Sequence, residues 1–152
     1  MREFFAERTL ISCIAVAAVI GVLTALIAHA YIGSFSRFIS DDYCTAAKVE
    51  KDGFWGAQQY WFTQWSGRFS FTAAISLAHY VGGPKVVPFV PGILLACWLI
   101  AASWALTPII PTRSRISLIT GPVLLAGIII ASTLATTPTI YESLYWETGA
   151  IT

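Results

Sequence analysis

Charge is scarce in this sequence. Of its 152 residues, 11% are Asp, Glu, Lys or Arg, well below the roughly 25% usual in soluble domains. Asparagine is absent, so the chain carries no sequon for N-linked glycosylation. The three cysteines cannot all pair, which excludes a disulfide-dense scaffold. The formal net charge of +1 provides no basic footprint, so we expect no nucleic-acid partner.

Hydrophobic residues are abundant instead, at 57% of the chain. They gather in three runs without a formal charge, over residues 10–32, 86–110 and 116–135. At a rise of about 1.5 Å per residue, each run can cross a hydrocarbon core about 30 Å thick. We therefore predict an all-α integral membrane protein, a single membrane domain over residues 1–152 with three transmembrane helices in contact with membrane lipid.

The first run also has features of a secretory signal peptide. Arg2 and Arg8 precede it, and residues 28–30 match the small-residue pattern of a cleavage site. The run is longer, however, than the about 7–15 residues usual for the apolar part of a signal peptide, and two more runs follow. We therefore interpret it as an uncleaved signal anchor.

The positions of the arginines predict the orientation. Arg2 and Arg8 precede the first span, and a second arginine pair lies in the short connection between the other two spans, which predicts an antiparallel helical hairpin. Because basic residues near span ends favour the cytoplasmic side, we place the N-terminus in the cytoplasm and the protein in the plasma (inner) membrane. Two spans separate the loop of residues 33–85 from the tail of residues 137–152, so both are predicted on the exterior face.

The long exterior loop is expected to contain short interfacial helices. Residues 54–69 are dense in aromatics, with Trp61 and Trp65 one helical turn apart, and such rings favour the headgroup layer. Residues 69–81 carry no Asp, Glu, Lys or Arg and are too short to span, which predicts a second helix partly immersed in the membrane. His79 in this helix is expected to be a packing residue rather than a ligand.

Two adjacent carboxylates, Asp41 and Asp42, follow shortly after the first span. Neighbouring side chains diverge by about 100° on a helix, so the two carboxylates are not expected to share one chemical role. Ser40 or Asp41 could cap a helix that begins near Asp42. Alternatively, one carboxylate lines a cleft as a general base or metal ligand while the other is held by a backbone or arginine partner. The residues alone leave both interpretations open.

Two further features place polar chemistry on the same face. Arg68 lies between two aromatic clusters, where a guanidinium needs a phosphate or carboxylate partner or must reach the lipid headgroups. In the tail, Glu142 and Trp146 would share one face of a helix. An aromatic ring beside a carboxylate is common in sugar-binding sites and equally typical of a water interface, so this composition also leaves two interpretations open.

Taken in order, these features resemble the N-terminal part of bacterial multi-span proteins related to the GT-C superfamily of membrane glycosyltransferases. The matching order is a span, an Asp-Asp-Tyr beside it, an aromatic run ending in Trp-Ser-Gly-Arg-Phe, a helical hairpin, and an exterior segment with Trp-x-Thr-Gly. The residues that carry the likeness are Asp41, Asp42, Tyr43, Trp65, Ser66, Gly67, Arg68, Phe69, Tyr145, Trp146, Thr148 and Gly149. Such enzymes have further spans, so the likeness also implies an N-terminal fragment of a longer chain.

The resemblance implies transfer of a sugar from a polyprenyl-phosphate donor, which would be the lipid-linked partner, to a cell-envelope acceptor. In that superfamily an acidic residue of the first exterior loop acts in catalysis, and this role falls on Asp41 or Asp42. Arg68 would supply positive charge to the departing phosphate. The remaining substrate contacts are expected from Tyr43, Trp65, Trp146 and Glu147. Some members recruit a divalent cation through such acids, so a divalent cation is the candidate cofactor.

A protein of a different class fits the same chain. A non-catalytic three-span membrane subunit, whose exterior loop is an interaction platform, needs no complete active-site motif, and the 152 residues contain none. A transporter is a weaker alternative, because none of the three runs has a charged residue near its middle, where an ion pathway normally needs one. Sugar transfer and a structural role therefore remain the two leading interpretations.

Overall fold

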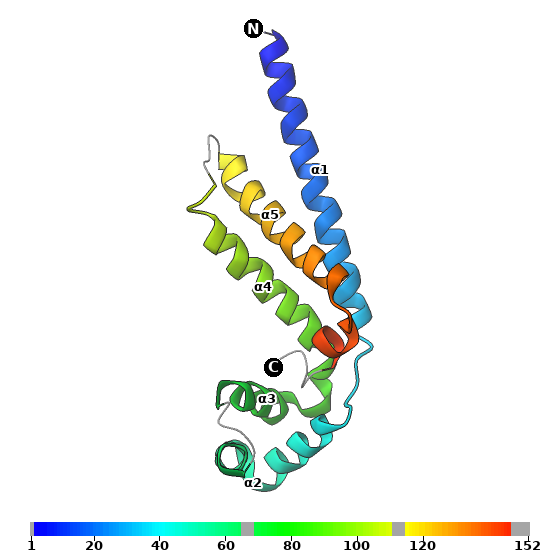
Figure 1. Cartoon of the computed structure of the whole chain (residues 1–152), viewed down its shortest axis with the longest axis vertical. Helices are drawn as coiled ribbons and strands as arrows, with labels where there is room; N and C mark the ends of the chain where they lie inside the picture. Colours follow the sequence, from blue (N-terminus) through cyan, green and yellow to red (C-terminus); the bar gives the residue numbers. More distant parts are fainter. Residues whose placement is uncertain (1, 65–68, 111–114, 147–152) are drawn as a thin grey trace. The chain divides into compact units, whose positions relative to one another are not determined.

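The computed structural model describes residues 2–64, 69–110 and 115–146, and all regular structure in these ranges is helical. The main helices are α1 (Arg2–Gly33), α2 (Asp41–Gln64), α3 (Phe69–Gly82), α4 (Val90–Leu106) and α5 (Arg115–Thr136), drawn in Figure 1. Three short elements complete the list: the 3₁₀ helices η1 (Gly83–Lys85) and η2 (Val87–Phe89) and the π-helical turn η3 (Tyr141–Tyr145). The all-α prediction is confirmed.

Three helical stretches in the described ranges are long and apolar enough to cross a membrane. They are Thr9–Gly33, Val87–Leu106 and Ile119–Thr136. They agree with the three predicted spans to within a few residues, because a run of about 20 apolar residues can satisfy its backbone hydrogen bonds in lipid only as a helix. The chain is therefore an all-α membrane protein.

Prolines set both ends of the second span. Pro88 and Pro91 lie in the first turns of η2 and α4, where a missing N–H removes no helical hydrogen bond. The predicted run reached Ile110, but α4 ends at Leu106. Pro108 explains the difference, because proline has no N–H to donate and disfavours helical backbone at the residue before it.

The chain divides into two compact units. One consists of Met1–His29 with Ile93–Thr137, and the other of Ala30–Gly92 with Pro138–Thr152. The first unit holds most of the spanning helices, and the second holds α2, α3 and the tail. The sequence predicted a single membrane domain, whereas the described helices form two compact units.

Small residues allow the helices of the first unit to approach one another. A methyl group added at Gly127 of α5 would overlap Cγ1 of Val22 in α1 and lie 3.9 Å from Leu99 of α4, so three helices meet here. Close approach at small residues is the usual basis of helix packing in lipid. Gly121 is in turn close to Ile110, and because the partner number falls as α5 advances, α4 and α5 run antiparallel, as predicted.

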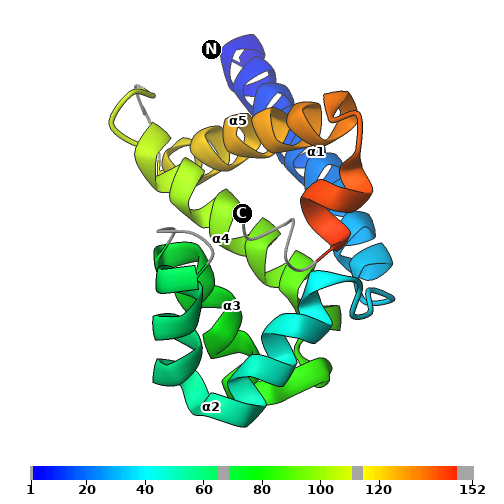
Figure 2. The ribbon, with the colours of Figure 1, turned by 60° about the horizontal axis from the view of Figure 1, so that its bottom comes forward.

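The second unit is organised around a bend in α2 at Gly53. Its φ of 69° and ψ of 177° are not helical, and this φ favours glycine because a side chain would be strained there. Figure 2 shows the bend and α3 packed beside α2.

Lys48 lies before the bend and makes two contacts. Its Nζ atom is 2.6 Å from Asp52 Oδ2, also before the bend, and 3.8 Å from the ring centroid of Tyr60, which lies after the bend. The hydrogen bond from Lys48 lowers the pKa of Asp52.

A buried pair of polar side chains joins α2 to α3. Gln58 Nε2 donates to the carbonyl oxygen of Thr72 at 2.8 Å, and the Thr72 hydroxyl donates back to Gln58 Oε1 at 3.0 Å. Buried amides and hydroxyls are costly unless hydrogen-bonded, so this reciprocal pair fixes the register of the two helices. The sequence predicted two helices in this stretch, and α3 lies where the second was expected.

Substitution of Gly127 by alanine is expected to loosen the first unit. The added methyl overlaps a β-branched valine with few rotamers, so the free energy of unfolding should fall by about 1–3 kcal/mol. Gly21→Ala is the matched control, because nothing lies within 4 Å of a methyl at that position, and alanine should be neutral or slightly stabilising in a helix. Unfolding in detergent micelles followed by circular dichroism measures both. Equal stability of the two variants would contradict this packing.

Candidate functional site

The backbone of Ile39 is the centre of the candidate site. Asp42, with 0% of its surface exposed, accepts the Ile39 N–H through Oδ2 at 2.9 Å, while its own N–H donates to the Ile39 carbonyl at 3.0 Å. A carboxylate that reaches back to a backbone N–H is half of a capping box. Between them, Ser40 has a φ of 47°, which is rare for a residue with a side chain.

The capping residue differs from the one expected. Ser40 or Asp41 was predicted to cap the helix, but the carboxylate that accepts a backbone N–H here belongs to Asp42. The Ser40 hydroxyl instead donates to Asp41 Oδ1 at 3.2 Å, and both side chains are exposed. The backbone of Ser40 is left-handed, and the reciprocal hydrogen bonds between Ile39 and Asp42 span this residue.

The two aspartates face different surroundings, as predicted. Asp41 is exposed at the first residue of α2, whereas Asp42 is buried one residue later. A solute can therefore reach the carboxylate of Asp41 without any change in the fold. The buried carboxylate of Asp42 holds the loop that positions Asp41.

The tail reaches the same point from the other end of the chain. The indole Nε1 of Trp146 donates to the Ile39 carbonyl at 3.2 Å, across a sequence separation of 107. The loop and the tail, which were predicted to lie on one face, are thus in contact here. Trp146 is extended, with φ −91° and ψ 117°, and it follows η3 rather than continuing a helix with Glu142. Glu142 and Trp146 would share a face only if one helix contained both, and this condition is not met, because the π-helical turn ends at Tyr145.

His79 is packed beside this junction. It is buried, and its ring lies edge-on to Phe38 with 4.9 Å between centroids, while Phe38 in turn lies 5.4 Å from Tyr43. Burial lowers the pKa of His79, and the negative charge of Asp42 acts in the opposite direction. The expected packing role of His79 is consistent with this environment.

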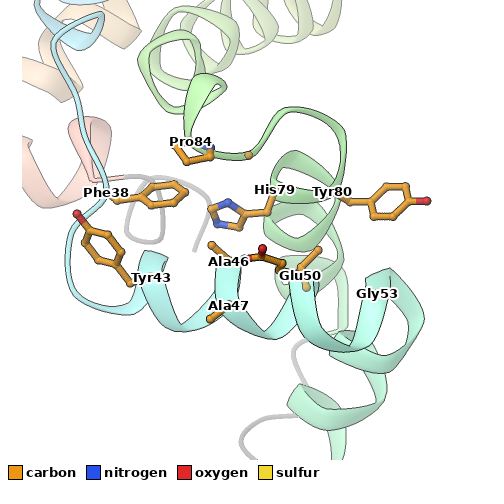
Figure 3. Close-up of a pocket in the computed structure, with 11 residues that line it drawn as sticks. Phe38, Tyr43, Ala46, Ala47, Glu50, Gly53, His79, Tyr80 and Pro84 are labelled. Carbon is orange, nitrogen blue, oxygen red and sulfur yellow. The ribbon is translucent and has the colours of Figure 1, made fainter.

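A groove of about 700 Å³ borders His79. One face of α2 forms its floor, with Tyr43, Ala46, Ala47, Glu50 and Gly53 at helical spacing. In Figure 3 the His79 ring lies beside Phe38, with Glu50 below it, and Tyr80 points the other way. The small side chains of Ala46 and Ala47 leave the floor open between the ring of Tyr43 at one end and the carboxylate of Glu50 towards the other.

Sequence reasoning missed Glu50. The spacing in the sequence could have indicated it, since Glu50 lies seven residues after Tyr43, on the same helical face, with small residues between them. The bend at Gly53 and the packing of α3 turn that face into a groove, and neither is a local property of the sequence.

The structure places some of the predicted substrate contacts and leaves others aside. Tyr43 is exposed and lines the groove, and Trp146 contacts Ile39. Trp65, Arg68 and Glu147 lie outside the described residues, so their roles stay predictions. Among the described residues, no group of three or more His, Cys, Asp or Glu side chains could hold a metal ion. The divalent cation also stays a prediction.

The fold defines the class of the protein. It is an all-α membrane protein with three candidate spans and a second helical unit that carries the junction at Ile39. No protein-family model, curated protein or solved structure matches the chain.

Replacing Asp42 with alanine is expected to destabilise the fold. The change leaves the Ile39 N–H without its carboxylate acceptor, and loss of such a cap costs about 0.5–2 kcal/mol. Asp41→Ala is the control, because its side chain is exposed and it should leave the free energy of unfolding nearly unchanged. Denaturant titration in micelles measures the difference. A loss of stability in Asp41→Ala as large as that in Asp42→Ala would contradict the assignment.

The stability of the fold should fall when the pH drops below about 6.5, the ordinary pKa of histidine. Burial lowers the pKa of His79 in the folded chain, so between the two values the unfolded chain binds a proton that the folded chain does not. The loss begins near pH 6.5 and continues down to the folded pKa. His79→Gln should reduce this pH dependence. Thermal unfolding of the wild type and this variant at pH 7.5 and 5.5 tests the assignment, and identical pH slopes in the two proteins would refute it.

Proposed function

We propose that this membrane protein acts in sugar transfer from a polyprenyl-phosphate donor to a cell-envelope acceptor. In this proposal the junction at Ile39 faces the exterior of the plasma membrane, and the N-terminus is cytoplasmic. The observation that carries the proposal is the pair of adjacent aspartates, in which buried Asp42 holds the loop and Asp41 is exposed to solvent. The order of motifs that resembles the GT-C superfamily supplies the reaction.

Asp41 is the base in this reaction. An acceptor hydroxyl is a poor nucleophile until a positioned base takes its proton. As the proton moves to Asp41, the acceptor oxygen bonds to the anomeric carbon. The bond from that carbon to the phosphate oxygen breaks, and its electron pair leaves with the polyprenyl phosphate. Arg68 is the proposed source of positive charge for that phosphate.

Asp42 is a positioning residue rather than a catalytic one. Its carboxylate is fully buried and hydrogen-bonded to Ile39, so a substrate cannot reach it in this fold. Trp146 donates from the tail to the carbonyl of the same residue. Together they keep the first turn of α2 in one place, which is what a base needs if it is to act on a bound hydroxyl.

The groove, whose lining on α2 begins at Tyr43, two residues after Asp41, is suited to a sugar. Its volume of about 700 Å³ is within the range of small-molecule sites, roughly 300–1,000 Å³. The ring of Tyr43 offers an apolar face on which a sugar ring can stack, and the carboxylate of Glu50 can accept hydrogen bonds from hydroxyls. The two side chains are separated by about 10 Å along α2, roughly the span of one to two sugar rings.

A non-catalytic subunit is the second candidate function. The observation in its favour is that Asp42 and Trp146 both hold the backbone of Ile39, as the side chains of a folded interaction platform would. In that case Asp41 would be an ordinary surface residue, and no reaction would depend on its carboxylate.

Asp41→Asn is expected to abolish transfer while leaving the protein folded in the membrane. Loss of a general base typically reduces a rate by about 10²–10⁴-fold. The assay follows radiolabelled polyprenyl-phosphate sugars in membranes that contain the full chain, with membrane insertion measured in parallel. Asp52→Asn is the control, because this carboxylate is exposed and pairs with Lys48. Full transfer activity in Asp41→Asn would remove the catalytic role, and no transfer from any donor by the wild type would favour the subunit.

A further inference from the structure

Helix α3 has two contrasting faces. On the inner face, Ile75, Ser76 and His79 are buried in the second unit. On the outer face, Leu77 and Val81 are 52% and 74% exposed. Apolar side chains exposed in this density on one side of a helix are costly in water and are typical of a surface that contacts lipid or another molecule.

The exposed surface continues onto α2. Trp55, just after the bend at Gly53, is 75% exposed, and Tyr80 of α3 is 65% exposed. Trp55, Leu77 and Tyr80 line one hollow of about 340 Å³, so they are neighbours although they come from two helices. We call the surface formed by Trp55, Leu77, Tyr80 and Val81 the outer patch.

The membrane is within reach of the outer patch. Helix α3 ends at Gly82, and the second candidate span begins at Val87. Five residue steps of extended chain cover at most about 18 Å, so the end of α3 is tethered close to the surface of the bilayer that the chain crosses. This limit follows from chain length alone.

The chemistry of the outer patch matches the boundary of a bilayer. Indole and phenol rings such as those of Trp55 and Tyr80 favour the headgroup layer, where one edge is apolar and the other can be hydrated. Leu77 and Val81 suit the adjoining acyl region. The exposed side chain of Lys85 lies between α3 and the span, where a lysine can extend to lipid phosphate.

We propose that the outer patch is a lipid-contact surface, and that it holds α3 in the interfacial layer of the membrane. A second consequence rests on the proposed function. Tyr80 lines both the hollow of the outer patch and the groove above the Tyr43–Glu50 floor. The groove and the outer patch are therefore neighbours, and in this proposal a substrate carried on a polyprenyl phosphate would reach the groove from the membrane side.

Spin labels in vesicles test the lipid contact. Cys13, Cys44 and Cys97 are first replaced with serine in the full chain. A nitroxide is then attached through Leu77→Cys or Val81→Cys, in vesicles of phosphatidylethanolamine and phosphatidylglycerol. Lys51→Cys, at an exposed charged position of α2, is the matched control. Collision rates with oxygen, which concentrates in lipid, and with a water-soluble nickel chelate are measured for each label.

The expected result is a several-fold higher ratio of oxygen to nickel collisions at positions 77 and 81 than at position 51. Equal ratios at the three positions would show that the outer patch faces water, and would overturn the proposal. Immobile labels that collide with neither reagent would also overturn it, because a second copy of the chain or another protein would then cover the patch. None of these readouts depends on sugar transfer, so the lipid contact and the proposed function can fail separately.

Discussion

The second unit depends on the hydrogen bonds at the Ile39 peptide. A buried carboxylate is costly unless it has hydrogen-bond donors, and Asp42 accepts one from Ile39 across the left-handed backbone of Ser40. The carbonyl of the same residue accepts both the Asp42 N–H and the indole N–H of Trp146. Removal of the Asp42 carboxylate would leave the Ile39 N–H without this acceptor, and removal of Trp146 would take away the hydrogen bond that joins the tail to the loop.

The bend at Gly53 gives this unit its two surfaces. Gly53 lines both the groove and the hollow of the outer patch, because it lies where α2 changes direction over α3. The cation–π contact of Lys48 with Tyr60 joins residues on the two sides of the bend, and the Gln58–Thr72 pair holds the second arm of α2 against α3. A single backbone conformation open to glycine thus places the candidate substrate groove next to the candidate lipid surface.

The features that the sequence predicted correctly are those that depend on local pattern. The three spans follow from uncharged runs of sufficient length, since lipid provides no hydrogen-bond partners for an irregular backbone. Helix α3 lies within one residue of its predicted bounds, because its apolar run ends at a glycine pair. The different surroundings of Asp41 and Asp42 follow from helical geometry. The end of the second span was misplaced, because hydropathy alone does not register the effect of Pro108.

Composition and periodicity therefore determined the class of protein, the number of candidate spans and the position of the paired aspartates. Only the tertiary structure decided which aspartate is buried, where the indole of Trp146 binds, and that Glu50 shares a groove with Tyr43. The physical reason is distance along the chain. The spans are set by interactions of each residue with lipid and with its own helix, whereas the Ile39–Trp146 contact joins residues 107 positions apart, and no local pattern specifies such a pair.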